Sequence, residues 1–197
     1  IKQKFDTAYY RQTNFALDSV LIKAVQNSSV KQFINMSSIG VNGEVSNNKS
    51  FSAIEAPKPT KPYAIVKNES EMLITATLTA SKIDFVHIRP PMVYGTGAPG
   101  NFARLQRLAG ASVPNIFTRI NNLRHFIAID NLLNLIECCI ANPRAAKQTF
   151  TVSDPTAVST GQVYEVLQNR SGAKSATLRV HPWLLRNLLG LYGGSEL

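Results

Sequence analysis

The sequence predicts an α/β fold in which helices flank a parallel sheet. Two short apolar runs, Gln32 to Ser38 and Asp84 to Arg89, have the length and composition of buried strands. Each run follows a segment with helical spacing of its apolar residues, near residues 8–27 and from Tyr63 to about Ser81. Helices that alternate with strands are typical of a parallel sheet with helices on its faces.

The first helical segment has a continuous apolar side. Leu17, Val20, Leu21, Ala24 and Val25 lie at positions i, i+3, i+4, i+7 and i+8. Residues with this spacing share one face of a helix. We expect this face to pack on the sheet.

A long loop and a region of shorter elements are predicted around these segments. Residues 43–61 are polar and contain Pro57 and Pro59, which favours a loop. From Gly95 onward, glycine and proline lead into the shorter elements. These are a helix near 101–108, a helix over 131–142 with Asp130 as its N-cap, a strand over 147–153, and a helix that starts at the capping-box sequence Ser159 to Gln162 and ends near Gly172.

Tyr63, Lys67 and Ser38 form a candidate catalytic group. Tyr63 and Lys67 lie one helical turn apart, so the ammonium favours the ionised phenol and lowers its pKa. Such a phenol can accept and return a proton. Ligands of open α/β sheets bind at the carboxyl ends of strands, so we expect the Ser38 hydroxyl to face the same crevice.

The tyrosine and lysine pair also has a purely structural alternative. The chain has six tyrosines and many lysines, and the same spacing arises when a tyrosine caps a surface helix beside an unrelated lysine. The pair on its own leaves both interpretations open.

Four segments together resemble the extended short-chain dehydrogenase/reductase family, in its group of nucleotide-sugar epimerases, dehydratases and C4 reductases. The segments are Ser37 to Gly43, the Tyr63 and Lys67 pair, Ile88 to Gly95, and Leu123 to Asp130. Their order and spacing agree with the family, and the likeness covers nearly the whole chain. It is greatest to bacterial enzymes that epimerise or reduce C4 of a UDP-linked amino sugar.

The resemblance implies a Rossmann-like parallel sheet flanked by helices and a smaller C-terminal substrate-binding lobe. Residues 1–95 would form the C-terminal half of the dinucleotide-binding domain and carry the catalytic group. Residues 96–197 would form mostly the substrate lobe, with some segments that return to the main domain. The glycine-rich βαβ unit with which the family begins has no counterpart in this sequence. We therefore expect a fragment that lacks the N-terminal part of the domain and binds dinucleotide poorly when isolated.

The resemblance also implies a role for each candidate site residue. The cofactor would be NAD or NADP, and the residues that would bind it are Asn14, Tyr63, Lys67 and Pro91. The residues that would contact a nucleotide-diphosphate sugar are Ser38, Met92, Asn101 and Arg124. The planar guanidinium of Arg124 suits bidentate contact with the diphosphate, and an ion pair with a carboxylate is its alternative.

The implied activity is hydride transfer at C4 of the sugar, in the synthesis of polysaccharide precursors. A 4-epimerase and a 4-keto-sugar reductase would use the same catalytic residues, so both stay open. Ile39 and Gly40 replace the Asp-Glu of the dehydratases, which argues against dehydration. Asn42 replaces a family tyrosine, and Met92 replaces an asparagine that touches the sugar in many 4-epimerases. A non-catalytic dinucleotide-binding or sensing protein of the same fold is the alternative from another class.

The net charge of +9 raises a third alternative, a nucleic-acid-binding domain. The lysines and arginines are spread along the chain, without a long basic run or interleaved aromatic residues, so we expect no nucleic-acid partner. A diphosphate-binding cleft and a missing acidic N-terminal half explain the positive charge more simply.

The composition indicates a globular protein of the cytoplasm. Hydrophobic residues make up 44% of the chain and charged residues 17%, which is enough apolar material for a core. We expect no membrane insertion and no signal peptide, because no apolar stretch is long enough and the first ten residues are polar and mixed. Cys138 and Cys139 suit reduced core thiols, and the three scattered histidines argue against a metal site. The resemblance also allows a homodimer.

Overall fold

The computed structural model describes residues 5–46, 49–98, 100–120, 122–172 and 177–181. The chain forms two compact units, one of Ile1–Pro91 with Ile129–Ser153 and the other of Met92–Ala128 with Asp154–Leu197. Each unit therefore combines two stretches that are separated in the sequence.

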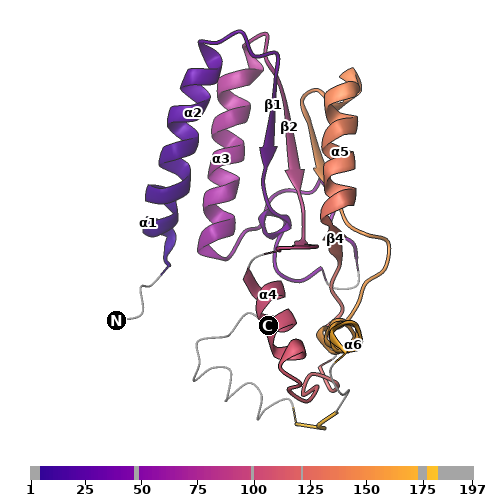
Figure 1. The fold of residues 1–197 in the computed structure, drawn as a ribbon. Coiled ribbons are helices and arrows are strands. Elements are labelled where there is room, and N and C mark those ends of the chain that lie inside the picture. The colour runs from indigo at the N-terminus through magenta and orange to yellow at the C-terminus, as the bar shows by residue number, and fades with distance from the viewer. Residues whose placement is uncertain (1–4, 47–48, 99, 121, 173–176, 182–197) are drawn as a thin grey trace. The chain divides into compact units, whose positions relative to one another are not determined.

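The described residues of the first unit contain a parallel sheet in the order β1, β2, β5 (Figure 1). β1 spans Gln32–Met36, β2 spans Asp84–Arg89 and β5 spans Gln148–Thr151. Ile88 of β2 lies opposite Met36 of β1 in the register. These strands confirm the three that the sequence predicts in this unit, and their common direction brings their carboxyl ends to one edge.

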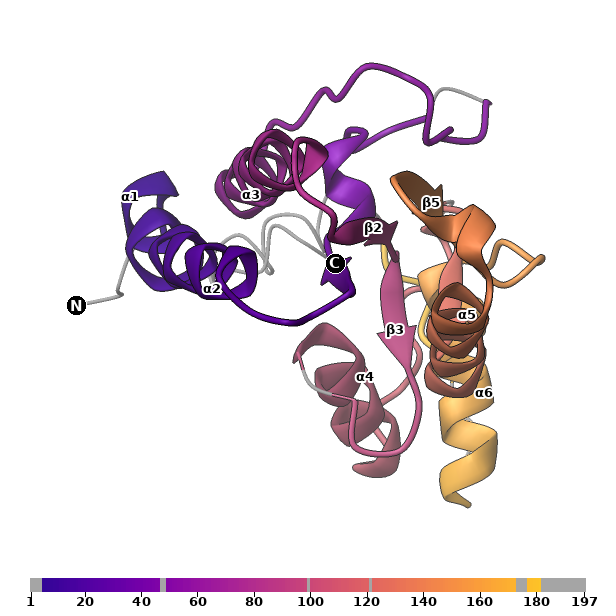
Figure 2. The ribbon, with the colours of Figure 1, turned by 90° about the horizontal axis from the view of Figure 1, so that it is seen from above.

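Helices cover both faces of this sheet. α3 (Pro62–Thr79) lies on one face, and α5 (Ile129–Ala141) lies on the other (Figure 2). Gln32 of β1 donates a hydrogen bond to the Cys139 carbonyl oxygen of α5 (3.0 Å). Because α5 already begins at Ile129, Asp130 lies in its first turn, and its predicted role as the N-cap is wrong.

The first helical segment is divided into three parts rather than forming one regular helix. α1 (Thr7–Tyr10) is followed by a π-helical turn over Arg11–Phe15 and then by α2 (Ala16–Gln26). The Asp6 carboxylate caps α1 by accepting a hydrogen bond from the Tyr9 N–H (2.9 Å). π-helical turns are uncommon and occur often at functional sites.

The buried side of α2 differs from the predicted one. Ile22 and Val25 are buried, whereas Leu17, Val20 and Leu21 are exposed. The core cluster of this region also contains residues of α3, β2 and the segment between them: Ile74, Leu78, Ile83 and Phe85. The predicted face is therefore wrong except at Val25. Apolar residues lie on several sides of α2, and packing against this cluster selects the side that contains Ile22.

The second unit contains a small parallel sheet of β3 (Met92–Tyr94) and β4 (Phe126–Ala128), with α4 (Gly100–Gly110) and α6 (Thr160–Ser171). The core between the two helices consists of Leu105, Ala109, Phe117 and Tyr164. This cluster packs α4 against α6, although the two helices are distant in the sequence.

The predicted start and end of α6 are confirmed. The Ser159 side chain accepts a hydrogen bond from the Gln162 N–H (3.2 Å), and the Gln162 side chain accepts one from the Ser159 N–H (2.8 Å). Gly172 follows the helix with φ of 69°, a conformation that favours glycine.

Candidate active site

Ser38 lies beyond the carboxyl end of β1 and caps the turn that follows. Its hydroxyl oxygen accepts a hydrogen bond from the Gly40 N–H (3.2 Å), at the start of a short 3-10 turn over Ile39–Val41. The Ile39 N–H donates to the Pro90 carbonyl oxygen (2.9 Å), just beyond β2. The Ser38 hydroxyl is therefore held at the edge where β1 and β2 end.

The first turn of α3 lies directly against this 3-10 turn. Pro62 occupies the start of the helix, where its missing N–H is tolerated, and Tyr63 follows with 38% of its surface exposed. A β-carbon placed on Gly40 would lie only 3.1 Å from the β-carbon of Ala64. The backbone near Ser38 thus closely approaches the backbone beside Tyr63.

Lys67 reaches from α3 to the end of β1. Its Nζ donates a hydrogen bond to the Met36 carbonyl oxygen (3.0 Å) and lies 6.0 Å from the centre of the Tyr63 ring. Lys67 therefore contacts the backbone close to Ser38 from the same helix that carries Tyr63. The structure places the three candidate catalytic residues at one end of the first unit.

The pKa of Tyr63 differs from the sequence-based expectation. Burial raises the pKa of the Tyr63 phenol, and the neighbouring Tyr10 and Asp18 raise it further. The rings of Tyr10 and Tyr63 meet edge to face with a centroid distance of 5.4 Å. The predicted lowering of this pKa is wrong, because burial and the electrostatic effects of Tyr10 and Asp18 act in the opposite direction.

Asn14 and Pro91, the other cofactor candidates, also belong to the first unit. The Asn14 side-chain oxygen accepts a hydrogen bond from the Thr13 hydroxyl (2.8 Å) within the π-helical turn. Arg11 ties this turn to α3, because its Nε donates to the Glu69 carboxylate (2.9 Å). Pro91 is half-buried after the end of β2. Cofactor binding by Asn14 and Pro91 stays a prediction.

The remaining substrate candidates lie in the second unit. Met92 begins β3 opposite Phe126, and Asn101 is half-buried in the first turn of α4. Arg124 is exposed, and its backbone exchanges two hydrogen bonds with Val158, at 3.0 and 2.9 Å. A fixed backbone with an exposed guanidinium suits contact with an anion. The roles of these three residues in substrate binding stay predictions.

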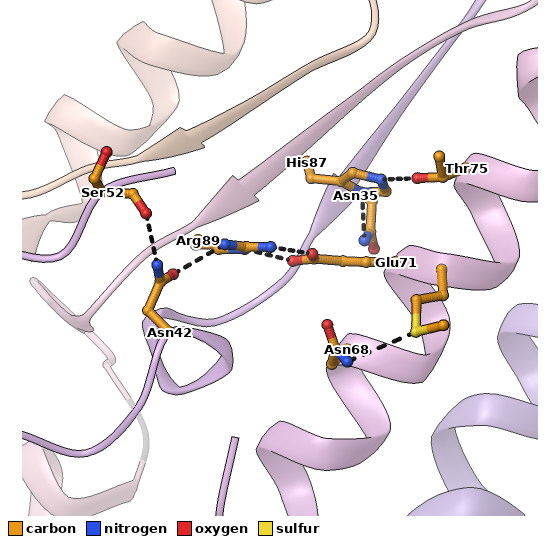
Figure 3. Close-up of polar contacts among 9 residues, drawn as sticks. Asn35, Asn42, Ser52, Asn68, Glu71, Thr75, His87 and Arg89 are labelled. Carbon is orange, nitrogen blue, oxygen red and sulfur yellow. Dashed lines mark hydrogen bonds and ion pairs between the residues drawn. The ribbon is translucent and has the colours of Figure 1, made fainter. Parts of the chain in front are cut away.

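Three buried polar residues to which we assigned no role from the sequence connect the elements of the site (Figure 3). Arg89, at the end of β2, donates to both carboxylate oxygens of Glu71 on α3, at 2.9 and 2.6 Å. Arg89 also donates to the side-chain oxygen of Asn42 (3.0 Å), which follows the 3-10 turn. The signal in the sequence is the arginine at the end of an apolar strand, because a buried guanidinium requires an acidic partner.

Metal-binding clusters and membrane-spanning helices are both absent from the part of the chain that the structure describes. The described residues contain no group of three or more histidine, cysteine, aspartate or glutamate side chains arranged to hold a metal ion. None of their helices combines the length and the apolar character needed to cross a membrane.

The model of the NAD dependent epimerase/dehydratase family matches residues 2–153. The chain therefore belongs to this family, and the predicted resemblance to nucleotide-sugar epimerases is confirmed. A UDP-glucose 4-epimerase of Vibrio cholerae is 37% identical over 190 residues, which cover 95% of this chain and 58% of that protein. The chain thus spans less than two thirds of the length of this relative.

Solved structures of sugar-nucleotide epimerases share the fold. The UDP-glucuronic acid 4-epimerase of Bacillus cereus in complex with NAD has a TM-score of 0.77 at 22% identity, over 92% of this chain and 60% of that one. The UDP-glucose 4-epimerase of Thermotoga maritima with UDP-glucose has a TM-score of 0.72 at 20% identity, over 92% and 63%. This likeness, with the parallel sheet between helices, confirms the predicted Rossmann-like α/β fold class.

Proposed function

We propose that this protein is an NAD-dependent 4-epimerase that transfers hydride at C4 of a UDP-linked sugar. The observation that carries the proposal is the gathering of Ser38, Tyr63 and Lys67 at the carboxyl end of β1. Membership of the epimerase/dehydratase family and the similarity to 4-epimerases support the choice of reaction.

The side chains at this end of the first unit fit the nicotinamide half of NAD. The cofactor, when bound, supplies the acceptance and return of hydride. The Lys67 ammonium has three N–H donors, of which one contacts the Met36 carbonyl, so the others suit the ribose hydroxyls. We assign Asn14 and Pro91 to the same cofactor site because they belong to the same unit. The NAD-bound epimerase of Bacillus cereus supports this cofactor.

Tyr63 moves the proton that accompanies hydride transfer. Its phenolate takes the proton of the C4 hydroxyl as C4 becomes a ketone, and its phenol returns the proton when the ketone is reduced. Ser38 donates a hydrogen bond to the same substrate oxygen and fixes its distance from Tyr63. Lys67 stabilises the phenolate through its positive charge. Rotation of the ketone before hydride returns would invert C4.

Arg124 and Asn101 bind the nucleotide part of the substrate in this proposal. The exposed guanidinium of Arg124 can form two parallel hydrogen bonds with diphosphate oxygens. Asn101 offers both an amide donor and an amide acceptor to the nucleotide. Met92 is the residue assigned to contact the sugar, where its flexible apolar side chain would pack against the ring.

A 4-keto-sugar reductase is the second candidate activity. It would use the same Ser38, Tyr63 and Lys67 but would release the oxidised cofactor after each reduction. The relatives that are named as 4-epimerases favour the first activity. Either activity would serve the synthesis of polysaccharide precursors.

The replacement Tyr63→Phe in the full-length protein tests the catalytic proposal. Phenylalanine keeps the ring and removes the hydroxyl that carries the proton. We expect epimerisation to fall by about 10²-fold or more, while the affinity for NAD changes by less than about threefold. Chromatography of UDP-glucose, UDP-glucuronic acid and UDP-N-acetylglucosamine after incubation measures turnover, and calorimetry measures NAD binding.

Tyr9→Phe is the matched control for this replacement. Tyr9 contacts the rings of Phe5 and Tyr10, and we expect its variant to keep wild-type turnover. Full turnover by Tyr63→Phe would refute the mechanism. NAD binding by the wild type without conversion of any of the three sugars would favour the non-catalytic alternative. Net consumption of NADH with a 4-keto sugar would favour the reductase.

The cytoplasm is the location we assign to the enzyme. Cys138 is an exposed free thiol and Cys139 a buried one, and a reducing compartment keeps such thiols reduced. A homodimer is the assembly we assign, and native mass spectrometry of the full-length protein would identify it.

A further inference from the structure

Ser38 and Tyr63 belong to different elements, so contacts between these elements must hold the two side chains in place for a joint role in catalysis. The loop over 43–61 joins these elements, and its described residues form no helix or strand. A loop of this length cannot by itself hold two oxygen atoms at a fixed separation. Other contacts must fix the 3-10 turn of Ser38 against α3.

A bridge of buried polar side chains makes this connection (Figure 3). Asn42 directly follows the 3-10 turn that Ser38 caps, and its side-chain oxygen accepts a hydrogen bond from Arg89 (3.0 Å). Arg89 donates two further hydrogen bonds to Glu71, at 2.9 and 2.6 Å. Glu71 lies on α3 one turn after Lys67 and two turns after Tyr63. The bridge therefore runs from the Ser38 turn to the catalytic helix without using the loop.

The three members of the bridge are well buried and fully oriented. Asn42, Glu71 and Arg89 are 5, 6 and 4% exposed. The Asn42 side-chain nitrogen donates to the Ser52 carbonyl oxygen (2.7 Å), so its oxygen must face Arg89. The fork of Arg89 meets the carboxylate of Glu71 with two bonds, which fixes the angle as well as the distance. A bridge of this kind permits one arrangement of the turn and the helix.

The same face of α3 carries further contacts with the sheet. Lys67, Glu71 and Thr75 follow Tyr63 at intervals of four residues, so they lie on one side of the helix. Lys67 contacts the Met36 carbonyl, and Thr75 contacts His87 of β2 (3.0 Å). These contacts fix the position of α3 along the strands. The bridge through Asn42 fixes the position of the Ser38 turn relative to the same helix.

We propose that Asn42 and Arg89 are positioning residues for hydride transfer, because their bridge to Glu71 sets the separation of the Ser38 turn from the helix of Tyr63 and Lys67. The inference rests on the proposed function and deepens it. Asn42 connects two parts of the chain, because its side-chain oxygen accepts a hydrogen bond from Arg89 and its side-chain nitrogen donates one to the Ser52 carbonyl.

The replacement Asn42→Ala in the full-length protein tests the inference. Alanine removes the bridge to Arg89 without changing Ser38, Tyr63 or Lys67. We expect kcat for epimerisation, per folded molecule, to fall by about ten- to a hundredfold, with KM for the UDP-sugar and Kd for NAD changed by less than about threefold. Asn169→Ala, at an exposed position of α6, is the matched control and should keep wild-type kcat.

A double-mutant cycle separates positioning from general destabilisation. If Asn42 and Glu71 act through one bridge, Asn42→Ala combined with Glu71→Gln should lower kcat little more than the more damaging single replacement. Thermal melts by circular dichroism identify the folded fraction. A lowered melting temperature with unchanged kcat per folded molecule would overturn the inference, and so would fully additive losses of kcat.

The replacement Arg89→Lys tests the same bridge if the Asn42→Ala variant does not fold. Lysine keeps a positive charge opposite Glu71 but cannot form the three directed hydrogen bonds of the guanidinium. We expect the same fall in kcat, and wild-type kcat in this variant would overturn the inference. A wild-type protein that converts no UDP-sugar would refute the proposed function instead, so the two failures are distinct.

Discussion

Tyr63 has surroundings that keep its phenol protonated. Burial raises its pKa most, and electrostatic interaction with Tyr10 and with Asp18 raises it further. A protonated phenol is the form that returns a proton to a ketone, whereas the phenolate is needed to remove one from a hydroxyl. The ionisation of Tyr63 should therefore limit the oxidative half of the reaction at neutral pH.

The replacement Tyr10→Phe tests this effect. It keeps the ring contact and removes the neighbouring phenol, which otherwise raises the pKa of Tyr63. We expect the pKa of Tyr63 to fall, so the rise of kcat with pH should occur at a lower pH than in the wild type. The measurement is kcat from about pH 7 to 11, because the pKa of Tyr63 in the wild type lies above the ordinary tyrosine value of about 10.

Tyr9→Phe serves as the comparison for this pH profile. Tyr9 contacts Tyr10 and Phe5, so its variant should reproduce the wild-type profile. A Tyr10→Phe profile that is unchanged, or moved to higher pH, would contradict the assignment of this limb to Tyr63.

At the scale of elements, the site depends on a close approach between a turn and a helix. Gly40 lies where a β-carbon would be 3.1 Å from the β-carbon of Ala64, which is tighter than ordinary contact. Gly40 does not have a positive φ, so alanine is allowed there by the backbone. The constraint on this position is therefore the space between the Ser38 turn and the first turn of α3.

The replacement Gly40→Ala should separate these two elements by a few tenths of an ångström. We expect kcat to fall by about tenfold, because small displacements of reacting groups are costly, while NAD affinity changes little. Adding Ala64→Gly removes the competing methyl group and should restore most of the lost kcat. The measurement is steady-state epimerisation by both variants.

Ala64→Gly alone is the control. It should lower the free energy of unfolding by up to about 1 kcal/mol, the usual effect of glycine in a helix, and leave kcat unchanged. A loss of kcat in Gly40→Ala that Ala64→Gly does not relieve would show that the methyl contact is not the cause.

At the scale of the whole molecule, a buried histidine links stability to pH. His87 is 2% exposed, and its ring nitrogens contact the Asn35 side-chain nitrogen and the Thr75 hydroxyl, each at 3.0 Å. Asn35 donates through its NH₂ group, so the facing ring nitrogen accepts and the ring is neutral. Burial lowers the pKa of His87, with Glu71 acting to raise the pKa and Arg89 acting to lower it.

This lowered pKa predicts that the protein loses stability in mild acid. Below the unfolded pKa of about 6.5 the unfolded chain binds a proton that the folded chain does not, so the free energy of unfolding falls as pH falls. The contribution of His87 to the slope is at most about 1.4 kcal/mol per pH unit. Urea unfolding from pH 7.5 to 5 should show a smaller slope in His87→Gln than in the wild type.

Asn169→Gln, at an exposed position of α6 and without a titratable group, is the control and should keep the wild-type slope. Equal slopes in His87→Gln and the wild type would remove His87 as the source of the acid sensitivity.

Much of the fold could be predicted because its signals are local. The strands β1 and β2 follow from short apolar runs. The start of α6 follows from Ser159 and Gln162, which bond to each other, and its end follows from Gly172, whose positive φ favours glycine. The resemblance implied that some later segments return to the main domain, but which residues return could not be predicted in the same way. Residues of the first unit are contributed by Ile129–Ser153, and a return of the chain to an earlier unit leaves no local mark in the sequence.

Residue type and spacing along the chain were enough to predict β1, β2 and β5, the family, and the position of Tyr63 and Lys67 on one helix, whereas the short strands β3 and β4 were not predicted. Three further features became visible only in the folded chain: the buried side of α2, the raised pKa of Tyr63, and the bridge by which Arg89 joins Glu71 to Asn42. The physical reason is that burial and electrostatic interaction depend on atoms that folding brings together from distant positions.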